Sequence, residues 1–268
     1  MTASAVVIRP TRAARVSLAA GITTFAVALG GCETAYRLAG ALWGAICFAA
    51  LFLGMVQVAA FAGRRKSTRP ELAALVMAAS MVPLDRLLVL SVPTVSYLRL
   101  YPNALWVVPM GLTAVYAYRS QWLPGTRPTL LPGRGWAPLA AQAGMVVAGA
   151  ELGVFAAYTL PHPATHVLLH QDPAKWAGAV LFALAGAAEE LAWRGALQRV
   201  AVDAAGPLGA VACFAASAYV AVAWMGPGAA APVIVFSGLA TVVVYRTRCL
   251  AGAMAGHAVL NLLLVMLR

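Results

Sequence analysis

The sequence predicts an all-α membrane protein, a polytopic bundle of eight or nine transmembrane helices. Of its 268 residues, 62% are hydrophobic and only 10% are charged, whereas soluble domains have about 25% charged residues. The mean hydropathy is +0.84. Long apolar runs recur along the chain, and each approaches the length of about 20 residues that a helix needs to cross a bilayer. This composition excludes a disordered chain, a secreted disulfide scaffold and a nucleic-acid-binding domain.

Nine runs are candidate spans. The first and the eighth are short, and the third is interrupted by Asp85, Arg86 and Pro93, so eight spans are the alternative. The stretch 119–135 is rich in proline and glycine and is the clearest linker. It divides the chain into N-terminal spans with their linker, 1–135, and a C-terminal membrane core, 136–268. The runs are 16–32, 38–62, 71–94, 102–118, 136–160, 175–197, 206–226, 230–245 and 249–267.

Basic residues follow the predicted loops. With a cytoplasmic N-terminus, most of them fall on the cytoplasmic side, as the positive-inside rule requires. The net charge of +11 therefore fits a protein in contact with a lipid bilayer and indicates no nucleic-acid partner. The cytoplasmic set is Arg9, Arg12, Arg15, Arg64, Arg65, Lys66, Arg69, Arg119, Arg127, Arg134, Arg199, Arg246 and Arg248; the opposite set is Arg37, Arg99, Lys175 and Arg268.

Ionisable residues inside the predicted spans are expensive to bury and are therefore candidates for function. Asp85 and Arg86 are adjacent and point about 100° apart on a helix. We expect them at a helix end near the interface, with Arg86 reaching the headgroups; an internal polar network is the alternative. Glu151 lies within a span with no cation nearby in the sequence. It is either a protonated helix-packing residue or a contributor to a polar cavity.

The segment 187–195, AAEELAWRG, is the most informative part of the chain. Glu190 and Arg194 are four residues apart and share one helical face, where an ion pair can offset the cost of burial. Glu189 projects about 100° away and has no local partner. A carboxylate in an apolar environment can act as a general base. The alternative is a helix cap at the cytoplasmic interface, with the Glu190–Arg194 pair as a stabilising contact.

The last span contains a second polar pair, His257 and Asn261. The two residues are four apart and lie on one helical face. Both side chains can donate hydrogen bonds to a developing oxyanion. The alternative is that they connect helices inside the bundle.

In these segments the chain resembles the CPBP family, also called Abi or CAAX-protease-like, of glutamic intramembrane endopeptidases. The resemblance covers about residues 175–265. It lies in EELAWRG at 189–195, the Gly206-Pro207 turn, YRTRCL at 245–250 and GHAVLN at 256–261. Members of this family cleave peptide bonds within or near the membrane. The resemblance implies a membrane-embedded or membrane-associated protein substrate and an integral protein of a bacterial inner (plasma) membrane.

The resemblance also implies roles for five residues. Glu189 would activate the attacking water, with Glu190 and Arg194 holding the polar network. His257 and Asn261 would stabilise the oxyanion.

One motif of the family is missing. The family has a second motif, FxxxH, whose His orients the water, and a gapless count places this motif at 218–222. The chain has Ala218 and Val222 at those positions. His162, His166 and His170 lie in a predicted loop on the outer side, away from the EExxxR segment, and are expected to be loop residues.

No metal and no other cofactor is expected. A catalytic zinc requires three protein ligands, and this region has one His and two adjacent Glu. The four cysteines lie in or beside apolar runs without the paired spacing of a metal site or a disulfide framework. They are Cys32, Cys47, Cys213 and Cys249.

The predicted function is hydrolysis of a peptide bond by a glutamate-activated water. The alternative is a non-catalytic relative that binds a hydrophobic peptide or helix as an immunity, assembly or sorting factor. The replacement of the second-motif His by Val222 favours this alternative, whereas the presence of the other five residues favours the enzyme. A proton-coupled transporter is a third candidate, but the chain lacks the inverted repeats and broken helix pairs of that class.

Overall fold

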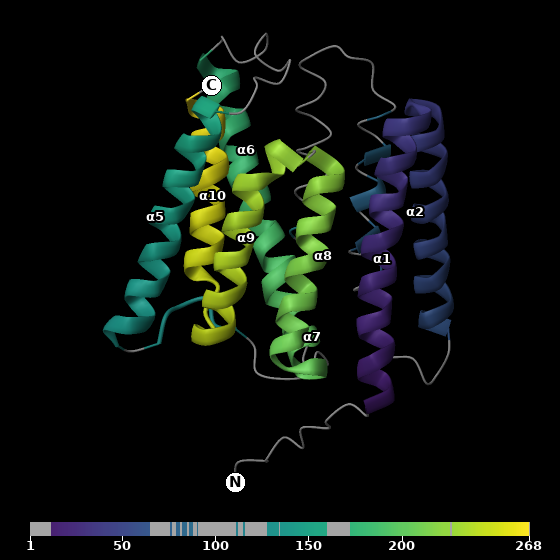
Figure 1. Cartoon of the computed structure of the whole chain (residues 1–268), viewed down its shortest axis with the longest axis horizontal. Coiled ribbons are helices and arrows are strands. Elements are labelled where there is room, and N and C mark those ends of the chain that lie inside the picture. Colours follow the sequence, from purple (N-terminus) through teal and green to yellow (C-terminus); the bar gives the residue numbers. More distant parts are fainter. Residues whose placement is uncertain are drawn as a thin grey trace.

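The structure, a computed structural model, describes residues 12–64, 128–133, 135–159, 172–225 and 227–267. It also describes residues 76, 79–80, 82–84, 86–87, 90, 111 and 115. In this part of the chain the fold is all-α (Figure 1). The helices are α1 (Arg12–Ala39), α2 (Ala41–Arg64), α5 (Trp136–Thr159), α6 (Asp172–Glu190), α7 (Arg199–Ala205), α8 (Pro207–Met225), α9 (Pro227–Thr247) and α10 (Ala251–Met266); a π-helical segment, η3 (Leu191–Gln198), joins α6 to α7.

The apolar runs predict most of these helices. α1 covers all of 16–32 and α9 all of 230–245, and α5 covers all but the last residue of 136–160. α2 covers 41–62 of the run 38–62, α8 covers 207–225 of the run 206–226, and α10 covers 251–266 of the run 249–267. The run 175–197 is divided between α6 and η3. Among the described residues, three helices are long and apolar enough to cross a membrane, Ala41–Phe61, Trp136–Thr159 and Pro227–Thr247. Two shorter apolar helices in the same part of the chain are Pro207–Val222 and Ala251–Met266. Most of 71–94 and 102–118 lies outside the described residues, so the number of spans stays a prediction.

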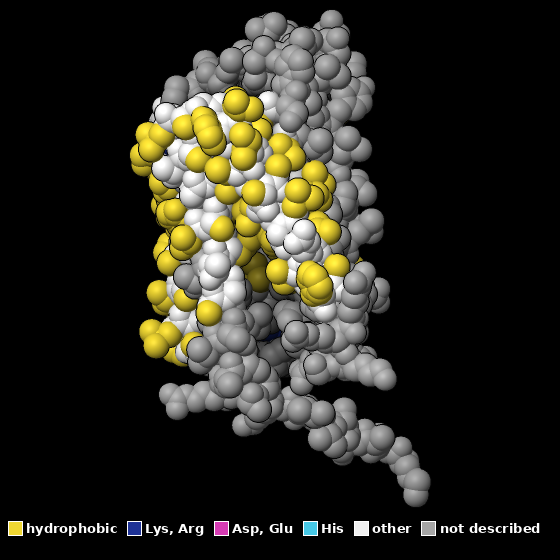
Figure 2. Space-filling view, turned by 90° about the vertical axis from the view of Figure 1, so that its right-hand side faces the viewer, with side chains coloured by type: hydrophobic (Ala, Val, Ile, Leu, Met, Phe, Trp, Pro, Cys, Tyr) yellow, Lys and Arg dark blue, Asp and Glu magenta, His cyan; other side chains and the backbone are white. Residues whose placement is uncertain are grey.

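The helices pack as one bundle. α10 packs against α5 and α6, while α8 lies between α9 and α1. α1 in turn contacts α2, which forms the opposite edge of the bundle from α5 (Figure 1). Figure 2 shows that hydrophobic side chains gather on the face formed by the first helices. On α2 these exposed side chains include Trp43, Leu53 and Phe61, as expected of a helix that faces lipid.

Close backbone contact fixes α10 against α5. A Cβ atom on Gly149 of α5 would overlap the carbonyl oxygen of Gly256, and one on Gly256 of α10 would overlap that of Met145. One turn along, a Cβ on Gly153 would lie 2.8 Å from the Leu260 oxygen. Small residues allow helices to approach this closely, and van der Waals packing is a main source of helix association in membranes. The glycines therefore determine how near α10 lies to the rest of the bundle.

The start of α10 is held by the linker and by α5. Thr129 forms a single parallel bridge with Cys249: its N–H donates to the Arg248 oxygen at 2.6 Å, and the Leu250 N–H donates to its oxygen at 2.8 Å. On α5, Gln142 donates to Thr247 Oγ1 at 3.0 Å and accepts from the Gly252 N–H at 2.7 Å. These bonds fix the turn between α9 and α10.

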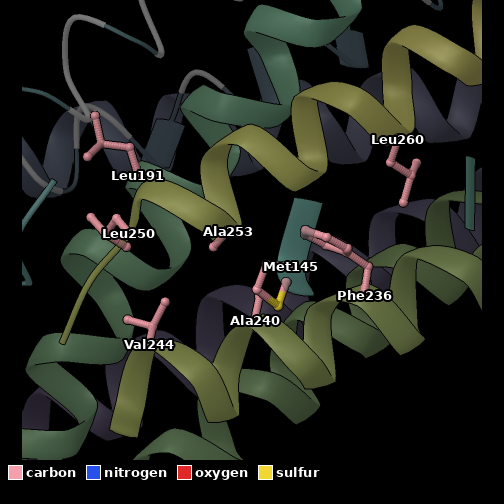
Figure 3. Close-up of a cluster of buried hydrophobic side chains, with 8 residues drawn as sticks. All are labelled: Met145, Leu191, Phe236, Ala240, Val244, Leu250, Ala253 and Leu260. Atoms are coloured by element: carbon pink, nitrogen blue, oxygen red, sulfur yellow. The ribbon is translucent and has the colours of Figure 1, made fainter. Parts of the chain in front are cut away.

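A buried apolar cluster fills the centre of the C-terminal helices. It combines side chains from α5, η3, α9 and α10 (Figure 3). Phe236 is its largest member, and its ring lies 5.3 Å from the His257 imidazole. The core therefore extends to the polar residues of α10. The cluster consists of Met145, Leu191, Phe236, Ala240, Val244, Leu250, Ala253 and Leu260.

The placement of Arg86 corrects one expectation. Its guanidinium does not extend to headgroups but donates to both carboxylate oxygens of Glu33 on α1, at 2.5 and 3.1 Å. It also lies over the Tyr36 ring, 5.2 Å from the ring centre. Glu33 is 2% exposed, so its partly buried guanidinium partner offsets the cost of its charge. The internal polar network is thus the correct alternative; Asp85 lies outside the described residues.

The structure also describes Glu151 and the four cysteines. Glu151 lies on α5 and is exposed, so its side chain is not enclosed between packed helices, and its role in a polar cavity stays a prediction. The four cysteines are free, as their spacing predicts.

Candidate active site

The two adjacent carboxylates lie where an α-helix changes into a π-helix. Glu189 and Glu190 are the last residues of α6, and η3 begins at Leu191. Short π-helical segments within helices are frequent at functional sites. The side chain of Glu190 is 1% exposed, whereas that of Glu189 is 35% exposed. One carboxylate is thus enclosed by the protein, and the other is accessible.

Glu190 forms the predicted ion pair with Arg194. The Arg194 Nη1 donates to Glu190 Oε1 at 3.0 Å, and both side chains are almost completely buried. The pair is therefore not a cap at an exposed helix end. The Arg194 guanidinium carries a positive charge at any pH relevant to proteins. The equally buried Glu190 carboxylate supplies the opposite charge.

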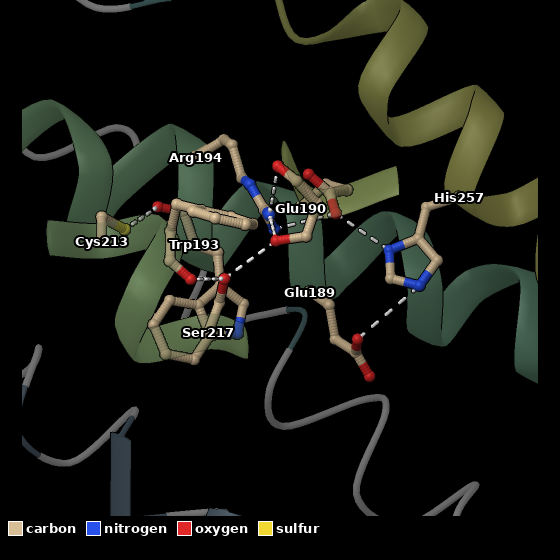
Figure 4. Close-up of polar contacts among 9 residues, drawn as sticks. Glu189, Glu190, Trp193, Arg194, Cys213, Ser217 and His257 are labelled. Atoms are coloured by element: carbon tan, nitrogen blue, oxygen red, sulfur yellow. Dashed lines mark hydrogen bonds and ion pairs between the residues drawn. The ribbon is translucent and has the colours of Figure 1, made fainter. Parts of the chain in front are cut away.

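Ser237 holds the other end of the guanidinium, and Ser217 of the neighbouring helix is bonded to Ser237. The Arg194 Nη2 donates to the backbone oxygen of Ser237 on α9 at 3.1 Å and also to its hydroxyl. Ser237 Oγ lies 2.9 Å from Ser217 Oγ of α8, and the Ser217 hydroxyl is also bonded to the Phe214 oxygen at 2.8 Å. A continuous polar chain therefore connects α8, α9 and η3 (Figure 4).

His257 of α10 extends this chain to both carboxylates. Its Nδ1 lies 2.9 Å from Glu190 Oε1, and its Nε2 lies 3.9 Å from Glu189 Oε2 (Figure 4). A carboxylate can only accept a hydrogen bond, so Nδ1 carries the proton in its bond to Glu190. Glu190 therefore orients the ring, and Nε2 faces Glu189. This is the arrangement in which a buried acid positions a catalytic imidazole.

Asn261 lies one turn further along α10 and is not bonded to the other four residues. Its Nδ2 donates to the backbone oxygen of Phe182 on α6 at 3.0 Å. Gly186 of α6 lies between the two polar residues of α10. A Cβ there would be 2.9 Å from Asn261 Nδ2 and 3.0 Å from His257 Cδ2. His257 and Asn261 therefore face the same helix, as their spacing predicts.

Two members of the polar chain, Ser217 and Ser237, are not among the residues that the sequence predicts for the site. A signal for Ser237 existed, because Ser237 and Thr241 are the polar residues four apart within the apolar run 230–245. Both are buried, and both contact η3. Ser217 follows Cys213 by four residues, and Cys213 also contacts η3, at the Trp193 oxygen. Only tertiary structure, however, brings Ser217 to Ser237.

The second-motif position is apolar and partly buried. Val222 lies on α8 five residues after Ser217, so the contact of α8 with the polar chain is made by a serine. His162, His166 and His170 lie outside the described residues. Among the described residues, no group of three or more His, Cys, Asp or Glu side chains is arranged to hold a metal ion. The expectation of no metal stays a prediction.

Comparison with known proteins agrees with the motif resemblance. Residues 171–263 match the family model described as type II CAAX prenyl endopeptidase Rce1-like. No curated protein and no solved structure gives a significant match to the chain. The matched range begins before α6, ends within α10, and contains Glu189, Glu190, Arg194, His257 and Asn261. Residues 171–263 are therefore a domain of the Rce1-like type II CAAX prenyl endopeptidase (CPBP) family.

Proposed function

We propose that the protein is an intramembrane endopeptidase that hydrolyses a peptide bond of a membrane-embedded or membrane-associated protein. The observation that carries this proposal is the pairing of one accessible carboxylate with an oriented imidazole. Glu189 is 35% exposed and faces His257 Nε2 at 3.9 Å. Behind them, the buried Glu190 and Arg194 neutralise each other and orient the ring.

The arrangement supports a simple sequence of proton transfers. A water beside Glu189 gives one proton to the carboxylate as its oxygen attacks the carbonyl carbon of the peptide bond. The His257 Nε2–H and the Asn261 amide are the proposed donors to the resulting oxyanion. When the intermediate collapses, the C–N bond breaks and the Glu189 proton moves to the departing nitrogen. The products are a carboxylic acid and an amine, and Glu189 is regenerated as the carboxylate. The acid, which keeps the second proton of the water, then gives this proton to the amine.

The oxyanion role defines the charge state of His257 in this proposal. Because Nδ1–H is bonded to Glu190, a donor at Nε2 requires that both ring nitrogens carry protons. The cation would then lie between two carboxylates, with Arg194 balancing the second. Two positive and two negative charges would be grouped together, which limits the cost of burying them.

The decisive experiment compares Glu189→Gln with the unchanged protein. The amide is nearly isosteric but cannot accept the proton of the water, so turnover should be abolished while the apparent Tm stays the same. The probe is a panel of membrane-anchored peptides with a quenched fluorophore across the scissile region, including a farnesylated CAAX peptide. Asn261→Ala should retain about 10⁻² to 10⁻³ of the rate, because it removes one oxyanion donor.

The same assay separates the enzyme from a binding protein. If Glu189→Gln cleaves like the unchanged protein, glutamate-activated hydrolysis is wrong. If neither protein cleaves any peptide but both bind them equally well, the non-catalytic alternative replaces the proposal. That alternative is favoured by Val222 at the second-motif position.

A further inference from the structure

A second polar contact joins η3 to α9 beyond the Arg194–Ser237 contact. Gln198 of η3 donates from Nε2 to the backbone oxygen of Thr241 on α9 at 3.0 Å. Both side chains belong to the interior, because Gln198 is 2% exposed and Thr241 is 5% exposed. Residues 194 and 198 face residues 237 and 241, so the two contacts lie one turn apart along the same seam between the helices.

This second contact leaves two buried polar atoms unsatisfied. Gln198 Oε1 and Thr241 Oγ1 have no hydrogen-bond partner within the part of the protein that the structure describes. Buried side-chain oxygens are nearly always bonded to protein or to ordered water. Exchanging the two ends of the Gln198 amide does not resolve this, because its oxygen would then face the Thr241 carbonyl oxygen. The amide therefore keeps its orientation, and its oxygen requires a donor.

We propose that an ordered internal water is bound between Gln198 Oε1 and Thr241 Oγ1. A water can donate to the amide oxygen and either donate to or accept from the hydroxyl, and internal waters typically make about three such bonds. The atoms involved exclude other small occupants. Two neutral oxygens are too few ligands for a metal cation, and a single hydroxyl donor is too little for an anion.

The bound water would add a further polar contact between η3 and α9, beyond those made by Arg194 and Gln198. Arg194 would then lie between Glu190 on one side and a hydrated Gln198–Thr241 pair on the other, all on one face of η3. This site is separate from the proposed hydrolysis at Glu189, since it lies two turns further along the segment. Its test therefore needs no substrate and no activity.

The sign of a stability change tests the proposal. Thr241→Val keeps the shape and the β-branch but removes the hydroxyl. If the hydroxyl binds a water, the variant loses that hydrogen bond and its apparent Tm in detergent should fall by about 2–4 °C. If the hydroxyl is dry and unpaired, removing it relieves a desolvation cost and the Tm should stay the same or rise, which overturns the proposal. Thr159→Val is the matched control, because the Thr159 hydroxyl is exposed and bonded to the Phe155 oxygen; its Tm should not change.

A direct measurement covers the case in which the variant does not fold. An experimental structure of the unchanged full chain, at a resolution that shows ordered water, should have density within hydrogen-bond distance of both Gln198 Oε1 and Thr241 Oγ1. A direct bond between these two atoms, or another protein group bonded to each, would overturn the proposal.

Discussion

Replacing Arg194 by alanine tests whether the buried ion pair holds the site together. The side chain is 4% exposed, and its removal breaks its bonds to Glu190 Oε1, the Ser237 oxygen and the Ser237 hydroxyl. Glu190, 1% exposed, then keeps only its contact with His257. Removing one partner of a buried pair costs about 3–5 kcal/mol, a large part of the total stability of about 5–15 kcal/mol that is usual for proteins.

This cost corresponds to a drop in the apparent Tm of about 6–20 °C for a chain of this size. The assay is thermal unfolding of the purified protein in detergent, followed by the amount that remains monodisperse. Arg246→Ala is the matched control, because it removes an exposed arginine near the end of α9. It should change the Tm little, since exposed charges contribute about 0–1 kcal/mol.

A double variant separates lost charge balance from lost packing. Arg194→Met leaves the Glu190 carboxylate without its cation, whereas Arg194→Met combined with Glu190→Gln removes the unbalanced charge as well. The double variant should therefore be more stable than Arg194→Met alone. Two results would contradict a stabilising role of the ion pair: Arg194→Ala unfolding at the temperature of the unchanged protein, or the double variant being less stable than the single one.

Two further predictions concern the packing around this site. Gly149→Ala should destabilise the protein by about 1–3 kcal/mol in thermal unfolding, because its new Cβ meets the backbone of Gly256. The control is Gly144→Ala on the same helix, which should be neutral because no atom lies within 4 Å of its new Cβ. Equal effects of the two substitutions would contradict the close approach of α10 to α5. Glu33→Gln should destabilise by about 1–3 kcal/mol, since the hydrogen bonds from Arg86 would lose their charged acceptor. The same substitution at the exposed Glu151 should have little effect, and an unchanged Tm for Glu33→Gln would show that the Arg86 pair contributes nothing.

Features set by local sequence could be predicted. The runs 38–62 and 249–267 are apolar over the length of a span, and α2 and α10 occupy them. Helical spacing alone places Glu190 beside Arg194 and His257 near Asn261 on one face. These predictions succeed because hydrophobic length and the period of a helix depend on neighbouring residues only.

Features set by contacts between distant segments could not be predicted. Glu33 and Arg86 are 53 residues apart, and His257 and Glu190 are 67 apart. Nothing in either local sequence identifies its partner, and Arg86 was therefore expected at the interface. The same holds for the π-helical geometry of η3. The sequence of η3 is typical of an ordinary α-helix. The change from α-helix to π-helix occurs between Glu190 and Leu191, just before the buried Arg194.

The missing second-motif histidine has a defined structural consequence. The resemblance to the family assigns that His to orienting water, but the polar chain does not pass through position 222. α8 enters the chain at Ser217, and the links from Ser237 through Arg194 and Glu190 to His257 involve no residue after it on α8. The replacement of that His by Val222 therefore removes a possible hydrogen-bond partner of the attacking water. It leaves the contacts that hold the Glu189–His257 pair in place. In the proposed mechanism that pair alone orients the attacking water, so Glu189→Gln, which removes the carboxylate from the pair, should leave no other group to activate the water.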